Sequence, residues 1–325
     1  MDTRLALFPL RGLLPYFLIR AQLRFLNQSN DRSGGKAVTI FGQALVLDVV
    51  DLEQKYLAAD CVREPENLLV YRAIAHSGLV DTFIDIGANC GHVAASIRGD
   101  FAHVLLFEPN PKLAMLLRTL FRNQAHIGVR ECAIVDEASV GNLALTVPDE
   151  SSGLATLGGT TLSKEHERVH VYDVKASTLE TELQGYSVQN AYIKIDVEGF
   201  ESNIIESARS LINSGRPIVG FEALSNQAAR NCARLFDEYV FYCARFDFLE
   251  NGGALSRSAA GMAKALIFGG NIEIIKLGDL EQTNLNNFSQ IYSVPQEKAA
   301  QFEASILAYA DRHRIFNLGC LKTWS

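Results

Sequence analysis

The fold is decided by the stretch Asp81-Thr-Phe-Ile-Asp-Ile-Gly-Ala-Asn-Cys-Gly91. Its first half, residues 81–86, is a short apolar run with β-branched residues, which is typical of a buried strand. Glycines at 87 and 91 then let the chain turn tightly and approach a ligand closely. Because Asp85 stands near the end of the strand, a carboxylate is placed beside the turn, where ligands bind in an open α/β sheet.

The pattern continues outward from this stretch as short β-branched runs that alternate with amphipathic helices. Such alternation predicts an α/β fold, with a mostly parallel sheet and helices on both of its faces. One helix is especially well specified, because Asn110 supplies an N-cap and Pro111 a first-turn residue before a leucine-rich face. Strands are predicted at 81–86, 103–107, 129–134, 191–195 and 217–221, closing strands at 239–246 and 287–294, and a terminal helix at 298–313.

Two regions interrupt this rhythm. Residues 141–175 hold two strand-like runs around a stretch rich in Gly, Ser and Thr, so we expect an inserted β element or a loop over the sheet edge. Residues 247–286 include a Gly- and Ser-rich segment and are expected to form a second insertion. The chain is thus divided into an N-terminal helical arm with an entry segment (1–60), a main α/β domain (61–296) that carries both insertions, and a C-terminal helical extension (297–325).

The first thirty residues form a basic and apolar arm, with arginines at 4, 11, 20 and 24 against Asp2 alone. We expect a helical arm that docks on the body of the protein. The alternative is a pair of interfacial helices that makes peripheral contact with an anionic membrane through residues 1–30. The net charge of −7 makes this alternative the weaker one. No run of about 18 apolar residues occurs, which argues against a membrane span.

The composition favours a globular protein, because 48% of the 325 residues are apolar and 21% are charged. With 30 Lys and Arg against 37 Asp and Glu, the chain carries a formal charge of −7, which argues against nucleic acid as a partner. Six cysteines without a CxxC pair indicate reduced thiols. We therefore expect a cytoplasmic protein, with the inner face of a membrane as the alternative location.

The glycine turn differs from that of a dinucleotide-binding protein. Such a turn needs G-x-G-x-x-G, but counting from Gly87 the other two positions hold Asn89 and His92. An acidic residue followed by a G-x-x-x-G turn instead suits a ligand with a cationic amino acid part and no diphosphate, such as S-adenosylmethionine. Glu108 follows the next predicted strand, where a carboxylate accepts hydrogen bonds from the hydroxyls of a ribose.

Charged residues also cluster where the predicted strand 191–195 ends, in Tyr192-Ile-Lys-Ile-Asp-Val-Glu-Gly199. Lys194, Asp196 and Glu198 would share one face of an extended segment. Charge at the end of a central strand is costly unless the groups pair or touch a ligand. We therefore interpret this segment as a wall of the active site. The alternative is a turn that neutralises itself through Lys194 and Asp196.

At these positions the sequence resembles the FkbM-type S-adenosylmethionine-dependent methyltransferases. The resemblance covers roughly residues 60–225 and rests on 83–91, Phe107-Glu-Pro-Asn110, Ala133-Ile-Val-Asp136 and above all Ile193-Lys-Ile-Asp-Val-Glu-Gly-Phe-Glu201; Tyr292-Ser-Val-Pro295 is similar to the closing strand. It implies a Rossmann-like class I methyltransferase sheet of seven strands, mostly parallel with the last strand antiparallel. It also implies O-methylation of a hydroxyl on a sugar or natural product, and hence a small-molecule, glycan or lipid-linked acceptor as the partner.

Carried over by position, the resemblance gives roles to individual residues. Asp85, Gly87, Asn89 and Gly91 form the turn around the methionine part of the cofactor, Glu108 binds its ribose and Asp136 lies near its adenine. Asp196 and Glu198 face the transferring methyl group, and Lys194 lies toward the substrate. A base that takes the hydroxyl proton is useful, and the candidates are Asp196, Glu198 and Glu222. Either of the first two could instead hold the ammonium group of the cofactor.

Two other functions stay open: an NAD-dependent Rossmann-type oxidoreductase, which the missing glycines disfavour, and a methyltransferase-like binding protein without catalysis. The segment His166-Glu-Arg-Val-His170 matches the zinc signature H-E-x-x-H, in which two histidines lie one helical turn apart. The valines around it favour a strand, which would separate the histidines by about 13 Å. We therefore expect no metal site.

Overall fold

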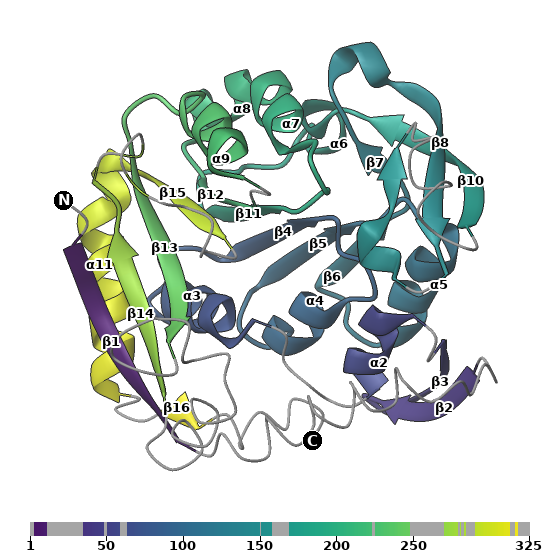
Figure 1. Cartoon of the computed structure of the whole chain (residues 1–325), viewed down its shortest axis with the longest axis horizontal. Coiled ribbons are helices and arrows are strands. Elements are labelled where there is room, and N and C mark those ends of the chain that lie inside the picture. The colour runs from purple at the N-terminus through teal and green to yellow at the C-terminus, as the bar shows by residue number, and fades with distance from the viewer. Residues whose placement is uncertain are drawn as a thin grey trace.

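A ten-stranded sheet runs through the centre of the molecule, with helices on both of its faces (Figure 1). The computed structural model describes residues 3–11, 35–48, 51–58, 64–149, 151–157, 169–222, 225–247, 270–278, 280, 283, 290–312 and 316–317. From one edge to the other, the strands follow the order β16-β1-β14-β13-β15-β12-β11-β4-β5-β6. This arrangement confirms the predicted α/β architecture.

Seven neighbouring strands of this sheet form the predicted methyltransferase-like core. They are β6 (Ile127–Arg130), β5 (His103–Phe107), β4 (Thr82–Ile86), β11 (Ala191–Ile195), β12 (Ile218–Phe221), β15 (Ile291–Pro295) and β13 (Tyr239–Asp247). Each adjacent pair from β6 to β12 is parallel, whereas β15 is antiparallel to both β12 and β13. The last of the seven strands along the chain is therefore the reversed one, as predicted.

Three further strands extend the sheet beyond β13, and they correct the prediction for the N-terminus. These strands are β14 (Gly270–Lys276), β1 (Thr3–Arg11) and β16 (Phe316–Asn317). The residues at 3–11 form a strand antiparallel to β14, where we expected part of a helical arm. Pro9 disfavours a helix interior, and the free edge of β14 offers backbone hydrogen bonds to this segment. The rest of the expected arm, 12–30, lies outside the described residues.

The helices divide between the two faces of the sheet (Figure 1). The first face carries α3 (Pro65–His76), α4 (His92–Ile97), α5 (Pro111–Leu120) and α11 (Gln296–Arg312), whose buried residues share one apolar cluster. The opposite face carries α6 (Leu179–Glu182), α7 (Glu201–Ser207), α8 (Arg209–Gly215) and α9 (Asn226–Ala233), which share a second cluster. The predicted cap of α5 is present, because Asn110 Oδ1 accepts a hydrogen bond from Lys112 N at 3.0 Å.

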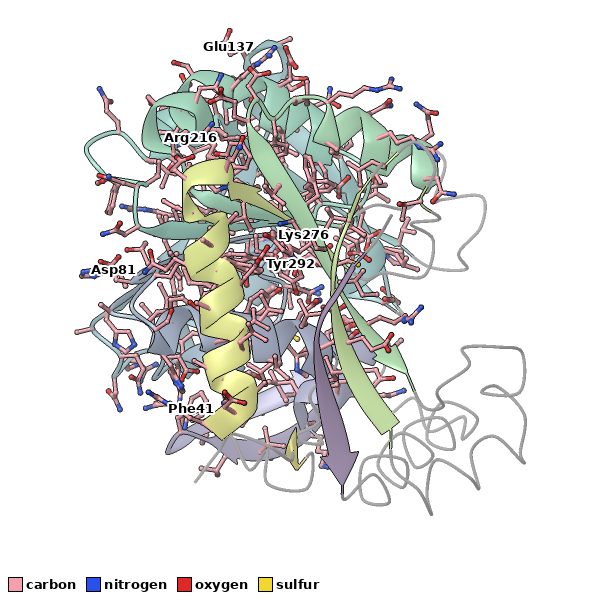
Figure 2. All side chains as sticks on the ribbon, turned by 90° about the vertical axis from the view of Figure 1, so that its left-hand side faces the viewer. Phe41, Asp81, Glu137, Arg216, Lys276 and Tyr292 are labelled. Atoms are coloured by element: carbon pink, nitrogen blue, oxygen red, sulfur yellow. The ribbon has the colours of Figure 1, made fainter. Side chains whose placement is uncertain are left out.

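The terminal helix α11 lies along the half of the sheet that contains β1, β14 and β13 (Figure 2). At its first turn, Arg216 Nη2 pairs with Glu297 Oε2 at 2.9 Å. This hydrogen-bonded pair holds the pKa of Glu297 at about 2, well below its ordinary value. The helix is therefore attached both by its apolar face and by a charged contact at its start.

The insertion at 141–175 contributes strands to a separate sheet, where we expected a β element or a loop. Its sheet follows the order β7-β10-β8-β9, formed by β7 (Ala133–Ile134), β10 (Val169–Ser177), β8 (Gly141–Pro148) and β9 (Thr156–Leu157). Two short 3-10 turns, η1 (Glu137–Ser139) and η2 (Ser152–Leu154), belong to the same region. His170 lies in β10 and pairs with Asp149 Oδ1 at 3.0 Å, whereas His166 lies outside the described residues.

The entry segment before the main domain is described at residues 35–48 and 51–58. Residues 35–48 form the hairpin of β2 (Gly35–Ile40) and β3 (Gln43–Asp48), and α2 (Leu52–Ala58) follows. The hairpin packs against α5, so it covers the first helical face. In the described part of the chain, no helix combines the length and apolar character needed to cross a bilayer.

Candidate active site

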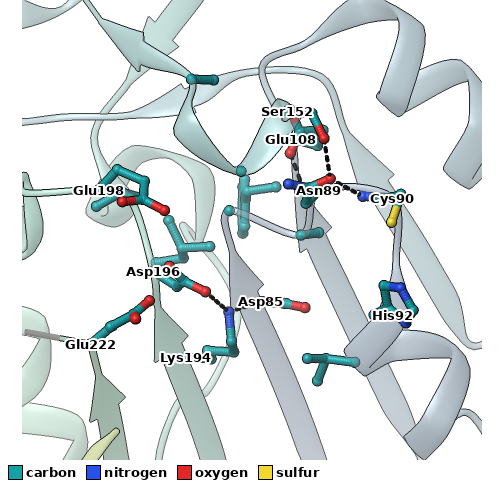
Figure 3. Close-up of a pocket in the computed structure, with 18 of the residues that line it drawn as sticks. Asp85, Asn89, Cys90, His92, Glu108, Ser152, Lys194, Asp196, Glu198 and Glu222 are labelled. Atoms are coloured by element: carbon teal, nitrogen blue, oxygen red, sulfur yellow. Dashed lines mark hydrogen bonds and ion pairs between the residues drawn. The ribbon is translucent and has the colours of Figure 1, made fainter. Parts of the chain in front are cut away.

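A cavity of about 210 Å³ lies where the parallel strands end (Figure 3). Its walls come from the turns that follow β4, β5, β11 and β12, from the helices α2 and α3, and from the inserted sheet. The strands β4 and β11 are neighbours in register, with Asp85 opposite Lys194. The sheet topology therefore brings together the three motifs that the sequence singled out.

The glycine turn after β4 requires the two glycines that the sequence shows. Gly87 has a φ of +88°, and a Cβ at this position would stand 1.9 Å from the backbone oxygen of Asp196. Gly91 has a φ of +85°, and its Cβ would stand 2.5 Å from the side chain of Leu117. The turn therefore lies in contact with the end of β11 and with helix α5, and side chains at these two glycine positions would displace the cavity wall.

Asp85 presents an unsatisfied carboxylate at the cavity. Its side chain is 1% exposed and neither of its oxygens accepts a hydrogen bond. Lys194 Nζ stands 3.4 Å from Asp85 Oδ1, as an ion pair. Burial raises the pKa of Asp85, against the lowering effect of Lys194. Because an unsatisfied buried carboxylate is costly, the ammonium group of a ligand is the kind of partner that this position fits.

Glu108 is fixed by the backbone of the two turns around it. Its Oε2 accepts a hydrogen bond from Asn89 N and its Oε1 one from Asn110 N, both at 2.8 Å. Burial raises the pKa of Glu108 to about 7, although these two bonds lower it. The carboxylate lines the cavity in a fixed orientation, with further acceptor capacity for the hydroxyls of a ribose.

Lys194 connects the two carboxylates on either side of it. Its Nζ donates to Asp196 Oδ2 at 2.8 Å and pairs with Asp85 Oδ1 at 3.4 Å. Burial lowers the pKa of Lys194, but the two carboxylates outweigh burial and raise it above its ordinary value. The Lys194–Asp196 pair is thus formed, and both of its members also line the cavity. The two interpretations of this segment are therefore compatible.

Two more carboxylates extend the wall beyond Asp196. Glu222 follows β12 and points toward Asp196 in Figure 3. Burial, the charge of Asp196 and a hydrogen bond with it raise the pKa of Glu222 to about 9. Glu198 lines the cavity from a turn in which its own φ is +53°. Glu201, which sequence reasoning missed, holds this turn by accepting hydrogen bonds from Val197 N and Gly199 N.

Asp136 is placed differently from the other predicted residues. Its Oδ1 accepts a hydrogen bond from Ser139 N and so caps η1, and Asn203 Nδ2 donates to its Oδ2 at 3.2 Å. The hydrogen bonds from Ser139 and Asn203 lower its pKa. Residues 132–134 line the cavity at this point, but Asp136 is not among the lining residues. The structure therefore does not bring its carboxylate into the cavity with the other predicted residues.

Several lining residues carry no motif in the sequence. Asn67 and Tyr71 reach the cavity from α3, Glu64 from the N-cap position before α3, and Glu53 from α2. Asn67 accepts a hydrogen bond from the hydroxyl of Tyr292, which anchors α3 to β15. Within the described residues, no three His, Cys, Asp or Glu side chains are grouped so that they could hold a metal ion.

The arrangement fits S-adenosylmethionine on observations of this chain. The unsatisfied Asp85 suits its ammonium group, the fixed Glu108 suits its ribose, and the turn at Gly87 has no room for a side chain. His92, which stands where a dinucleotide-binding turn has its third glycine, donates from Nε2 to the backbone oxygen of Glu53 at 3.0 Å. The turn therefore lacks the glycine-lined cradle that a dinucleotide pyrophosphate needs.

Comparison with known structures gives likenesses of low identity. A methyltransferase FkbM from Methylobacillus flagellatus matches with 16% identity and a TM-score of 0.34, over 50% of this chain and 39% of that chain. An O-methyltransferase from Bacillus cereus in complex with SAH matches with 12% identity and a TM-score of 0.34, over 68% and 84%. M. jannaschii TYW2 in complex with AdoMet matches with 7% identity and a TM-score of 0.35, over 80% and 87%. The chain thus spans less than half of the first of these proteins.

A search among curated proteins found no match to this sequence. The family assignment rests on a sequence model, the methyltransferase FkbM domain, which matches residues 85–250. That range is just over half of the 325 residues and contains Asp85, Glu108, Asp196 and Glu222. The chain therefore belongs to the FkbM family of S-adenosylmethionine-dependent methyltransferases.

Proposed function

We propose that this methyltransferase methylates a hydroxyl group on a sugar, glycan or natural-product acceptor. The observation that carries the proposal is the continuity of one cavity from Asp85 and Glu108 to Asp196 and Glu222. Cofactor-binding carboxylates and a candidate base thus share a single chamber. The sulfonium of S-adenosylmethionine is already an activated methyl donor, so the protein mainly has to position the acceptor oxygen in line with it.

Asp85 and Glu108 hold the cofactor in this proposal. Asp85 accepts the ammonium group and thereby gains the hydrogen bonds that it lacks. Glu108 accepts the ribose hydroxyls, because its two backbone hydrogen bonds fix its orientation toward the cavity. Gly87 lets the backbone approach the methionine part. The wall at 132–134 replaces Asp136 as the neighbour of the adenine.

Asp196 is the base that the geometry favours. Lys194 Nζ donates to Asp196 Oδ2 at 2.8 Å and so orients its carboxylate, whereas Glu222 holds its proton at neutral pH because its pKa is about 9. A protonated Glu222 donates its hydrogen bond to Asp196, and the remaining capacity of Asp196 accepts the proton of the acceptor hydroxyl. Glu198 stays the second candidate. Lys194 serves the substrate indirectly, by orienting Asp196.

Calorimetric titration tests the cofactor part of the proposal. We expect the protein to bind S-adenosylmethionine and S-adenosylhomocysteine and to give no heat with NAD. Glu108→Ala should weaken binding of both sulfur nucleotides by about tenfold or more, because ribose hydrogen bonds are lost. Asp136→Asn is the matched control and should bind as the wild type does, since Asp136 caps η1 outside the cavity. Failure of well-folded wild type to bind either nucleotide would sink the proposal.

The catalytic part is tested by separating binding from turnover. Asp196→Asn should bind S-adenosylhomocysteine yet lower methyl transfer to glycan, lipid-linked or small-molecule hydroxyl acceptors by about a hundredfold or more. Radiolabelled methyl transfer to a panel of such acceptors provides the readout. Cofactor binding without transfer to any acceptor would favour a catalytically silent binding protein. Absorbance changes with NAD would instead revive the oxidoreductase.

A further inference from the structure

A buried carboxylate joins two segments that flank the cofactor end of the cavity. Asp51 is 5% exposed, and its Oδ1 accepts hydrogen bonds from Glu53 N at 3.1 Å and Ser152 N at 3.0 Å. Its Oδ2 accepts a third bond, from Gln54 Nε2 at 3.0 Å. The bond to Ser152 spans 101 positions of the chain. A buried carboxylate with three donors is a specific joint between α2 and η2.

The same two segments contact the glycine turn, and Figure 3 shows the contact between Ser152 and Asn89. Ser152 Oγ donates to Asn89 Oδ1 at 3.0 Å, and that oxygen also accepts from Cys90 N. On the other side, His92 Nε2 donates to the backbone oxygen of Glu53 at 3.0 Å. The joined segments therefore hold the turn at two points, Asn89 and His92.

These contacts lie at the part of the turn that touches Glu108. The backbone N–H of Asn89 donates to Glu108 Oε2 at 2.8 Å, while its φ of +50° is unusual for a residue with a side chain. Ser152 holds the side chain of Asn89 in the conformation that goes with this backbone. Glu53 and Ser152, which are 4% and 8% exposed, line the cavity beside it.

We propose that Glu53, Asp51, Ser152 and Gly153 form a roof over the cofactor end of the cavity, in which Asp51 and Ser152 are positioning residues for the Asn89 turn. The roof holds Asn89 and thereby Glu108 in the arrangement that receives the ribose, and it retards the release of S-adenosylhomocysteine. This inference rests on the proposed cofactor-binding roles. Asp51 and Glu53 precede the matched family domain, which begins at residue 85.

Stopped-flow and calorimetric measurements with S-adenosylhomocysteine on the full chain test the roof. Ser152→Ala should weaken affinity by about fivefold, mainly through faster dissociation, since it removes one hydrogen bond worth about 1 kcal/mol. Asp51→Ala removes three accepted hydrogen bonds and should weaken affinity by at least as much. Asp51→Asn keeps an oxygen for Ser152 N and Glu53 N, so it should restore most of the affinity. Ser207→Ala is the matched control, because the Ser207 hydroxyl bonds Ile204 O in α7, away from the cavity.

A second readout distinguishes positioning from general stabilisation. In steady-state assays the two alanine variants should raise the KM for S-adenosylmethionine and leave the KM for the acceptor unchanged. If Asp51→Ala does not fold, Ser152→Ala alone decides, because it removes one hydroxyl. Wild-type affinity and dissociation rate in Ser152→Ala would overturn the roof. Absence of binding by the wild type would instead refute the cofactor roles on which the roof depends.

Discussion

At the scale of single residues, two carboxyl groups that line the cavity hold their protons to a higher pH than free carboxyl groups do. Burial and the neighbouring charge of Asp196 raise the pKa of Glu222 to about 9, and burial raises that of Glu108 to about 7. A carboxyl whose pKa is raised on folding binds its proton more tightly in the folded state. Its contribution to stability is therefore present below its unfolded pKa, near 4.5, and is lost as the pH rises through the folded value.

The loss of this stabilising contribution at high pH predicts how the stability of Glu222→Gln compares with that of the wild type. The amide is neutral at every pH, so the variant avoids the cost of ionising a buried group. Its melting temperature relative to that of the wild type should therefore rise between pH 5 and pH 9, by several degrees. Thermal melts of both proteins across this range give the difference, in which the contribution of Glu108 cancels. A difference in melting temperature between the two proteins that stays constant from pH 5 to pH 9 would contradict the raised pKa of Glu222.

Glu297→Gln is the control of opposite sign. A hydrogen bond from Arg216 holds the pKa of Glu297 at about 2, so its contribution is present above about pH 4.5 and lost as the pH falls toward 2. The variant should thus be less stable than the wild type near neutral pH. The effect should be small, because the Glu297 side chain is 53% exposed.

Residues at strand ends were predictable because the strand pattern is local. Asp85, Glu108 and Asp196 each end or follow a buried strand, and parallel strands bring their carboxyl ends to one edge. The side chain of Asp136 caps η1, and the strand pattern does not indicate this contact. Ser139, three positions later, is the partner in that cap, and a preference for capping competes with a role in binding.

At the scale of elements, the residue that caps helix α5 also contacts a carboxylate of the cavity wall. Asn110 caps α5 through its side chain, and its backbone N–H donates to Glu108 Oε1. Asn110→Ala removes the hydrogen bond that caps α5. The backbone bond to Glu108 is kept, but the side chain of Asn110 no longer fixes the turn that makes it. We expect a loss of about 1 kcal/mol in the free energy of unfolding, together with weaker binding of S-adenosylhomocysteine.

Ser225→Ala provides the comparison for this prediction. Ser225 caps α9 by accepting from Ala228 N at 3.1 Å, so its loss should cost a similar free energy. Affinity for S-adenosylhomocysteine should then be unchanged. Denaturant unfolding and calorimetry on both variants measure the two quantities. Equal affinity in both would show that the α5 cap does not support Glu108.

The elements that sequence reasoning missed are those whose position depends on distant partners. The α3 residues at the cavity, such as Asn67 and Tyr71, carry no motif, and their orientation follows from contacts with β15 and residue 290. Likewise, β1 forms because β14 presents a free edge to it, although the two are more than 250 residues apart in the chain. Local patterns cannot specify such pairing, since the partner strand decides it.

At the scale of the whole molecule, three strands of the sheet lie between the N-terminal strand β1 and the strands that end at the cavity. In the strand order, β14, β13 and β15 lie between β1 and β12, the nearest strand that leads into the cavity. The cofactor end is formed by β4, β5 and β11, which lie farther still. An extension of the sheet edge can therefore stabilise the molecule without shaping the cavity.

Removing residues 1–11 tests this separation and the expected role of the arm together. Loss of β1 leaves the edge of β14 unpaired, so the melting temperature should fall by roughly 5–10 °C and aggregation should increase. Affinity for S-adenosylhomocysteine at 20 °C should stay within about twofold of the wild type. Sedimentation with anionic phospholipid vesicles tests the alternative, in which the arm binds a membrane. An unchanged melting temperature with loss of vesicle binding would favour the membrane role of the arm, because a strand that belongs to the sheet cannot be removed without cost to the folded state.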